Sequence, residues 1–259
     1  KMMKLRKAVG DMGAKVVAWT WARRVGTVLL GTLFVFLPCT GQTTWKRAYG
    51  GVERDVARSI KALPDGGAVI CGSTGSFGTQ GGDLYLIRVD ESGGCIWSML
   101  AGGVGVQEGR DVVLLPDGGF LAVGTSDRGD YGGYDGYAVR VSAAGATLWE
   151  HTYGTNAWDF FASGIFDGTH LVLGGSTFGS DDPAGALLLV KVDLMGNVVW
   201  MNDYGIAGND EGGYVSIRSD GRYVLAGTGD TGDNADAVVV MIDQDGTEQW
   251  TTRVMEAGE

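Results

Sequence analysis

From about residue 42 to its end, the chain alternates short apolar runs with turns that are rich in glycine and aspartate. The runs are too short for globular helices, and the Gly, Pro and Asp residues between them favour turns, so each run is predicted to be a β-strand. Most of these strands are apolar on both faces. Sheets built from them need cover on both sides, and the pattern therefore predicts an all-β fold of packed sheets.

Tryptophan reveals the period of this pattern. Five tryptophans are separated by 52, 52, 51 and 50 residues: Trp45, Trp97, Trp149, Trp200 and Trp250. A fixed period of this length is typical of repeat proteins, so each interval is interpreted as one structural unit. The units cover about residues 46–97, 98–149, 150–200 and 201–250, and residues 251–259 are interpreted as the start of a further unit. A tryptophan at the same place in every unit is expected to pack between units rather than to stack on a sugar.

Each unit is predicted to contain four strands joined by hairpins. A turn such as Leu63-Pro64-Asp65-Gly66-Gly67 separates two of them, because Pro fixes φ and Gly supplies a positive φ. The strand after the turn is expected at 68–74, 120–125, 171–177 and 223–228. A loop rich in glycine and aspartate then leads to a strand at 85–90, 137–142, 188–193 and 238–243. Four consecutive strands of this kind form an antiparallel meander.

We predict a β-propeller of four-stranded antiparallel blades, about four of which are present. In a propeller each sheet packs between its two neighbours, which covers both apolar faces. Four blades lie at the low end of the usual range, so an incomplete ring is expected, with a closed four-bladed ring as the alternative. A parallel β-solenoid fits less well, because its repeats rarely need tight antiparallel hairpins.

Residues 1–41 are interpreted as a signal peptide or an N-terminal membrane segment. Seven Lys and Arg residues precede the uncharged run 25–38, which is the order found in secretory signals. The run is shorter than the roughly 20 residues of a bilayer-spanning helix, which favours cleavage. Cleavage before Gln42 is favoured over a lipoprotein site at Cys39, and an uncleaved anchor is a further alternative. The expected localisation is the cell surface, the periplasm or the extracellular space.

The formal net charge of -11 argues against nucleic acid as a partner, because phosphate binding needs clustered Lys and Arg. Among the three cysteines, Cys39 belongs to the N-terminal segment. Cys71 and Cys95 are expected on strands separated by an intervening strand, roughly 10 Å apart. A disulfide needs Cα atoms within about 7 Å. Both residues are therefore predicted to be unpaired, buried thiols.

Few residues point to a metal site or to catalysis. The two histidines, His151 and His170, suggest neither a zinc site nor a catalytic triad. Asp230, Asp233 and Asp236 are the best calcium candidate, because calcium favours several oxygen ligands on a flexible loop. No other cofactor is expected. The remaining acids of the corresponding loops are interpreted as solvated turn residues: Asp83, Asp127, Asp130, Asp135, Asp181 and Asp182.

The close of the unit has the form Asp-x-x-Gly-x-x-x-Trp at 90–97, 193–200 and 243–250, with Ser142 replacing the Asp in the second copy. This signature resembles that of quinoprotein-like propeller blades. Together with the Tyr-Gly-Gly, Asp-Gly-Gly and Gly-Ser-Thr segments, it is similar to the exported propeller-repeat proteins common in Bacteroidetes. The resemblance covers about residues 42–259. Quinone-dependent dehydrogenases with similar blades use a vicinal cysteine pair and calcium-ligating carboxylates, and this sequence has no adjacent cysteines.

The sequence favours a noncatalytic exported β-propeller that acts as a binding or assembly surface at the cell envelope. The expected partner is a protein or a glycan, and membrane contact is expected only through residues 1–41. The alternative is a propeller enzyme, either a glycan hydrolase or a quinone-linked oxidoreductase, with an axial active site. Paired carboxylates in a deep axial pocket would indicate the enzyme, whereas a shallow polar pocket would indicate binding.

Overall fold

The structure, a computed structural model, describes residues 44–79, 81–179, 185–205, 209–230 and 235–254. The predicted signal or membrane segment at 1–41 lies outside the described residues, as do Asp181, Asp182, Asp233 and residues 255–259. The described part of the chain contains sixteen β-strands and no helix, so the predicted all-β fold is confirmed. Accordingly, it holds no apolar helix long enough to span a membrane.

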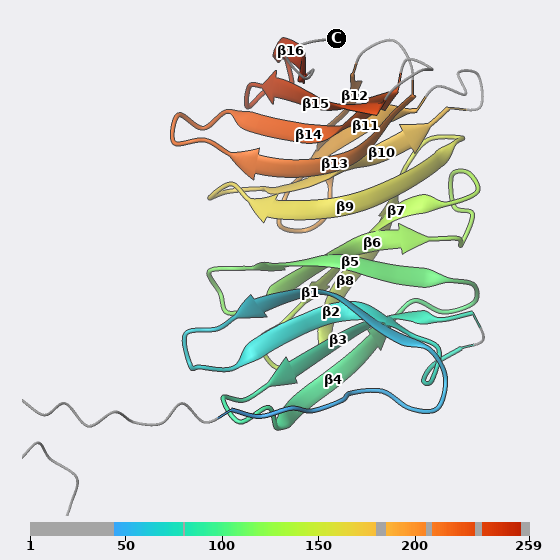
Figure 1. The fold of residues 1–259 in the computed structure, drawn as a ribbon, viewed down its shortest axis with the longest axis vertical. Coiled ribbons are helices and arrows are strands. Elements are labelled where there is room, and N and C mark those ends of the chain that lie inside the picture. The colour runs from blue at the N-terminus through green and yellow to red at the C-terminus, as the bar shows by residue number, and fades with distance from the viewer. Residues whose placement is uncertain (1–43, 80, 180–184, 206–208, 231–234, 255–259) are drawn as a thin grey trace, which may run out of the picture. The chain divides into compact units, whose positions relative to one another are not determined.

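The strands form four antiparallel sheets, and each sheet uses four consecutive strands in chain order (Figure 1). Sheet 1 contains β1 (Asp55–Ala62), β2 (Ala68–Thr74), β3 (Asp83–Val89) and β4 (Cys95–Ala101). Sheet 2 contains β5 (Gln107–Leu114), β6 (Phe120–Ser126), β7 (Asp135–Val141) and β8 (Thr147–Tyr153). Sheet 3 contains β9 (Trp158–Phe166), β10 (Leu171–Phe178), β11 (Ala186–Val192) and β12 (Val198–Tyr204). Sheet 4 contains β13 (Asn209–Ile217), β14 (Tyr223–Asp230), β15 (Ala235–Ile242) and β16 (Glu248–Val254). This is the predicted meander.

The Asp-Gly-Gly turns join the first two strands of a sheet. In sheet 1 the Gly66 N–H donates to the Leu63 carbonyl oxygen at 3.0 Å, and Gly66 has a φ of 83°. The Asp65 carboxylate accepts the Gly67 N–H at 3.0 Å. Glycine is needed because the turn requires a positive φ, which other residues rarely adopt.

The sheets are shifted along the chain relative to the predicted units. Trp97 lies in β4, the last strand of sheet 1, and Trp250 lies in β16, which pairs with β15. Residues 251–254 therefore complete sheet 4 rather than open a further unit. Trp45 precedes β1 and is not part of a strand.

Apolar side chains fill the spaces between consecutive sheets. Separate clusters of buried residues lie between sheets 1 and 2, between sheets 2 and 3, and between sheets 3 and 4. The middle strands β6 and β7 are buried at every position. Leu121, Phe161 and Leu225 are among the largest fully buried side chains, and each contributes about 1.5–3 kcal/mol by leaving water. Packing between sheets is therefore a main source of stability.

Three repeated tryptophans also connect neighbouring sheets. The indole N–H of a fourth strand donates to a carbonyl oxygen in the last turn of the next sheet: Trp97 to Ala143 at 3.2 Å, Trp149 to Leu194 at 3.0 Å, and Trp200 to Gln244 at 3.1 Å. Trp45 makes the same bond to Glu91 of sheet 1 at 2.9 Å. Their place in the fold is structural.

A basic residue on the third strand binds the turn aspartate in three sheets. The pairs are Arg88 with Asp65, Arg140 with Asp117, and Lys191 with Asp167. The first two aspartates are largely exposed, whereas the side chain of Asp167 is only 4% exposed. In sheet 4 the turn Asp220 pairs instead with Arg222 at 2.7 Å.

The cysteine prediction is half wrong. Cys71 on β2 is buried and Cys95 on β4 is exposed, and the two are not bonded to each other. Cys95 is exposed because β4 is the last strand of its sheet and most of its residues face solvent. Burial raises the pKa of the Cys71 thiol well above its usual range, so of these two thiols Cys95 is the one accessible to thiol reagents.

Candidate functional site

The first strand of every sheet contains an irregularity at the same place. Arg58, Arg110 and Ala162 are each an extra, unpaired residue in β1, β5 and β9, so each forms a β-bulge. In β13 the pairing skips from Glu211 to Tyr214. A bulge re-aims the side chains beside it and is common next to binding sites.

A glycine on the second strand makes room for each irregularity. A Cβ on Gly124 would lie 1.8 Å from the Glu108 carbonyl oxygen, which no real Cβ tolerates. The corresponding glycines of the other sheets are similarly crowded. A Cβ would lie 1.8 Å from a first-strand carbonyl oxygen at Gly72, 1.7 Å at Gly175 and 2.4 Å at Gly227. The glycine and the bulge therefore require one another.

The four first strands together line one hollow of about 540 Å³. The polar and aromatic side chains in its wall are Arg58, Ser59 and Lys61 of β1, Arg110 and Asp111 of β5, Ser163 of β9 and Tyr214 of β13. Every sheet thus contributes to this site.

Asp111 connects three of these strands. Its Oδ1 accepts a hydrogen bond from Ser59 Oγ at 2.7 Å and lies 3.1 Å from Lys61 Nζ. Its Oδ2 accepts the Gly164 N–H of β9 at 3.3 Å. Because this carboxylate is shared between sheets 1, 2 and 3, it fixes the shape of the hollow.

Ser163 performs the same role between sheets 3 and 4. Its hydroxyl donates to the Gly213 carbonyl oxygen at 3.1 Å and accepts the Val215 N–H at 2.8 Å. Since both bonds go to the backbone, this hydroxyl positions β13 and is not an activated nucleophile.

Two guanidinium groups share one carboxylate at the rim. Arg58 and Arg110 lie 2.9 Å and 3.2 Å from the same oxygen of Glu108. A guanidinium carries five N–H donors, so one shared oxygen leaves most of them for a ligand. The Arg110 side chain is 41% exposed, and at this exposure an ion pair contributes little to stability.

A second hollow of about 620 Å³ adjoins the first, and Arg110, Ala162 and Tyr214 line both. Trp158 and Tyr214 are 56% and 66% exposed. Exposed aromatic side chains that gather around a hollow mark binding surfaces. We name these two hollows, with six of their residues, the first-strand surface: Arg58, Lys61, Arg110, Asp111, Trp158 and Tyr214.

Ring contacts hold the aromatic wall in place before any ligand arrives. Tyr134 packs edge-on against Trp158 with ring centroids 5.5 Å apart and stacks on Phe160 at 5.8 Å. Phe160 also contacts Phe178 at 5.8 Å. A prearranged wall lowers the entropy that binding costs.

The first-strand surface has the chemistry of a binding site. The described residues that line its two hollows include no histidine and no cysteine. Asp111 in the first hollow and Glu108 at the rim are both held by basic side chains, and the exposed Glu211 is a further carboxylate in the wall of the second hollow. Hydrogen bonding, ion pairing and aromatic stacking are the interactions that this surface offers.

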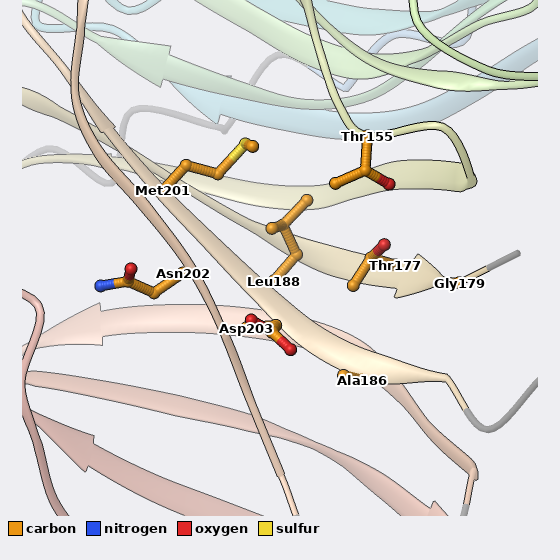
Figure 2. Close-up of a pocket in the computed structure, with 8 residues that line it drawn as sticks. All are labelled: Thr155, Thr177, Gly179, Ala186, Leu188, Met201, Asn202 and Asp203. Atoms are coloured by element: carbon orange, nitrogen blue, oxygen red, sulfur yellow. The ribbon is translucent and has the colours of Figure 1, made fainter. Parts of the chain in front are cut away.

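A smaller hollow of about 380 Å³ lies at one end of sheet 3 (Figure 2). Its lining combines the apolar Leu188 and Met201 with the polar residues Thr155, Thr177, Asn202 and Asp203. Among the described residues that line it, Asp203 carries the one carboxylate.

The predicted calcium residues are only partly described. Asp233 and the side chain of Asp230 lie outside the described residues, whereas Asp236 is paired with Arg253. In the described part of the chain, no three His, Cys, Asp or Glu side chains gather as a metal site. Calcium at Asp230, Asp233 and Asp236 stays a prediction.

Two loop acids differ from their prediction as solvated residues. Asp83 and Asp135 are 3% and 0% exposed. Each is the first residue of a third strand, and the loop before the strand folds over it so that its carboxylate accepts a backbone N–H.

His151 is exposed, and its ring stacks on Trp149 with ring centroids 5.1 Å apart. This ring contact is not a metal site.

The sequence analysis did not single out the first-strand surface. The available signal was the spacing of Arg58 and Arg110, which stand 52 residues apart at equivalent positions. Trp158 and Tyr214 gave no signal, because they have no counterpart in the repeat.

No protein family model matches the chain, and no curated protein matches it. Among solved structures, it is similar to one described as the crystal structure of the eukaryotic initiation factor, with 7% identity and a TM-score of 0.33 over 76% of this chain and 55% of that chain. It is also similar to the tail fiber of Staphylococcus aureus phage P68, with 14% identity and a TM-score of 0.28 over 74% of this chain and 50% of that chain. The chain thus spans about half the length of these structures.

Proposed function

We propose that the four sheets are blades of a β-propeller and that the first-strand surface lies around its axis. The sheets pack on one another in chain order, and the first strand of each lines the same hollow. In a propeller the innermost strands of all blades meet around the axis, where ligands commonly bind. The resemblance of the repeat to quinoprotein-like blades supports the same arrangement.

The protein acts as a noncatalytic binding module, and its ligand is a glycan. The observation that carries this proposal is the joining of exposed aromatic rings, Trp158 and Tyr214, to the hydrogen-bonding Arg110 in neighbouring hollows of about 620 and 540 Å³. These volumes match those of small-ligand sites, whereas a protein partner usually needs a broader surface. Sugar rings stack their apolar faces on aromatic side chains and direct their hydroxyl groups to polar ones.

The site of action is outside the cytoplasm, at the cell surface, in the periplasm or in the extracellular space. The order of basic and then apolar residues in 1–41 supports export. A glycan-binding module at the cell envelope also agrees with the excess negative charge, which promotes solubility and disfavours nucleic acid.

Affinity electrophoresis of the full chain tests this proposal. Native gels would contain a neutral glucan, a mannan, a xylan, pectin or alginate, and we expect slower migration in at least one polymer than in a polymer-free gel. Prolonged incubation with that polymer should release no new reducing ends. Unchanged migration in every gel would contradict glycan binding, and release of reducing ends would favour the hydrolase.

A further inference from the structure

Two buried carboxylates, Asp135 and Asp159, meet between sheets 2 and 3. Asp135 is the first residue of β7 and Asp159 the second of β9, and both are 0% exposed. Gly154 marks how closely they approach. A Cβ at Gly154 would lie 2.6 Å from Asp159 Oδ2 and 2.9 Å from Asp135 Oδ1.

Each carboxylate uses one oxygen to fix a neighbouring loop. Asp135 Oδ2 accepts the Tyr131 N–H at 3.2 Å, and Asp159 Oδ2 accepts the N–H and the hydroxyl of Thr155 at 2.7 and 3.2 Å. Hydrogen bonds from backbone N–H groups favour the ionised form of a carboxyl group. The pair is thus arranged to carry negative charge.

The remaining oxygen of each carboxylate, Oδ1, is buried and has no hydrogen-bond partner within the described residues. None of the ion pairs found there includes Asp135 or Asp159. A buried, unpartnered carboxylate oxygen is costly. In agreement, burial and the nearby charge of Asp159 raise the pKa of Asp135 despite its backbone hydrogen bonds.

Within the described residues, the neighbouring interfaces do not repeat this doubled charge. Between sheets 1 and 2, Gln107 replaces the second aspartate, and a Cβ on Gly102 would lie 2.2 Å from Gln107 Oε1 and 2.9 Å from Asp83 Oδ1. Between sheets 3 and 4, Ala186 stands where Asp135 stands in sheet 2. Of the three described interfaces, the one between sheets 2 and 3 holds two facing carboxylates.

The hollow of Figure 2 lies beside this pair, on the far side of Thr155 from Asp159. Thr155, which binds Asp159 through two hydrogen bonds, is exposed and lines that hollow together with Asp203. The exposed Asp203 carboxylate adds negative charge at the entrance. Thr155 therefore stands between the buried Asp159 carboxylate and the solvent of this hollow.

We propose that Asp135 and Asp159 bind a divalent cation, with a preference for Ca²⁺, between sheets 2 and 3. The two Oδ1 atoms are its side-chain ligands, and main-chain oxygens and water complete the coordination. Calcium tolerates irregular sets of six to eight oxygens, whereas Mg²⁺ demands near-octahedral geometry. Two carboxylates suit an affinity of roughly 10⁻⁴–10⁻³ M, as in extracellular calcium modules.

Thermal unfolding of the full chain tests the proposal. Calcium at about ten times the dissociation constant should raise the unfolding midpoint by about 3–6 °C relative to EDTA. Asp159→Gln copies the arrangement of Gln107 and should abolish this shift, as should Asp135→Asn if the first variant does not fold. Asp83→Asn, at the neighbouring interface, is the matched control and should keep the shift. Titration calorimetry should show that Asp159→Gln binds one calcium ion fewer per chain than the wild type.

Four results would contradict the proposal. If calcium does not raise the unfolding midpoint of the wild type, the protein has no such site. If calcium raises the midpoint of Asp159→Gln as much as that of the wild type, the cation binds elsewhere. In EDTA, the unfolding temperature of the wild type could instead decrease as the pH is raised from about 5 to about 8, with no response to calcium. That result would mean that the two carboxyl groups share a proton and bind no cation. An equal response to Mg²⁺ would contradict the preference for Ca²⁺.

Discussion

Replacement of Asp167 by asparagine is expected to lower the free energy of unfolding by about 3–5 kcal/mol at pH 7, the loss typical of breaking a buried ion pair. Asp167 Oδ2 lies 3.3 Å from Lys191 Nζ and accepts the Tyr223 hydroxyl at 2.7 Å. Asp167 and Lys191 are only 4% and 8% exposed as side chains. The variant therefore leaves the Lys191 charge buried without its counter-ion, and urea unfolding measures the loss.

The effect of Asp167 should depend on pH. Burial acts to raise the pKa of Asp167, but hydrogen bonds from the Tyr223 hydroxyl and from His170 and Thr169 outweigh it, so the pKa lies well below its usual value. A lowered pKa in the folded state stabilises the protein above the unfolded pKa, near 4, and this stabilisation is lost as the pH falls towards the folded pKa. The difference between wild type and variant should therefore shrink below about pH 4.

Asp65→Asn is the matched control, because Asp65 occupies the same turn in sheet 1 and pairs with Arg88. The Asp65 side chain is 58% exposed, so the variant should lose no more than about 1 kcal/mol. Equal losses at both positions, or a loss at Asp167 that does not change with pH, would contradict the assignment of a buried ion pair.

Gly124→Ala is expected to destabilise the protein by about 3 kcal/mol, at the upper end of overpacking effects. The new Cβ would lie 1.8 Å from the Glu108 carbonyl oxygen, and a backbone atom cannot turn aside as a side chain can. Relief requires the bulge at Arg110 to move. Urea unfolding measures the change, and a smaller slope with denaturant would indicate that the native sheet has loosened.

Gly164→Ala provides the comparison on a first strand. Its nearest obstacle is a methyl group of Val113, 3.1 Å from the new Cβ, which can shift slightly. We expect a loss of less than about 1 kcal/mol, within the range of ordinary substitutions. If Gly124→Ala is no more harmful than Gly164→Ala, the second-strand glycine is not what admits the bulge.

The sequence predicted the sheets well because its signals are local. Turns such as Leu63-Pro64-Asp65-Gly66-Gly67 need a positive φ, and this requirement is visible in the residues themselves. The start of each sheet was harder to predict, because a repeat of four strands looks the same whichever strand is counted first. Only the pairing of β16 with β15 shows that Trp250 closes sheet 4.

The candidate site depends on features that a repeat hides. A bulge adds one residue to a strand without changing its apolar character, so Arg58 and Arg110 resembled ordinary strand residues. Asp135 resembled a solvated turn residue because its burial arises from a loop that folds over it and from the approach of the neighbouring sheet near Asp159, which no local pattern records. Tyr214 has no counterpart at the equivalent positions of the other units. A search for residues that the units share therefore passes over it.

The central claim is that the first-strand surface binds the ligand, and the most direct measurement is the affinity of two variants. Trp158→Ala and Tyr214→Ala should each weaken retention in the best polymer gel at least about tenfold, as expected for exposed aromatic anchors. Tyr131→Ala is the control, because Tyr131 is 54% exposed but lies outside the two hollows. The account predicts that only the first two variants lose binding. If both bind within about twofold of the wild type, the ligand binds elsewhere and the claim is wrong.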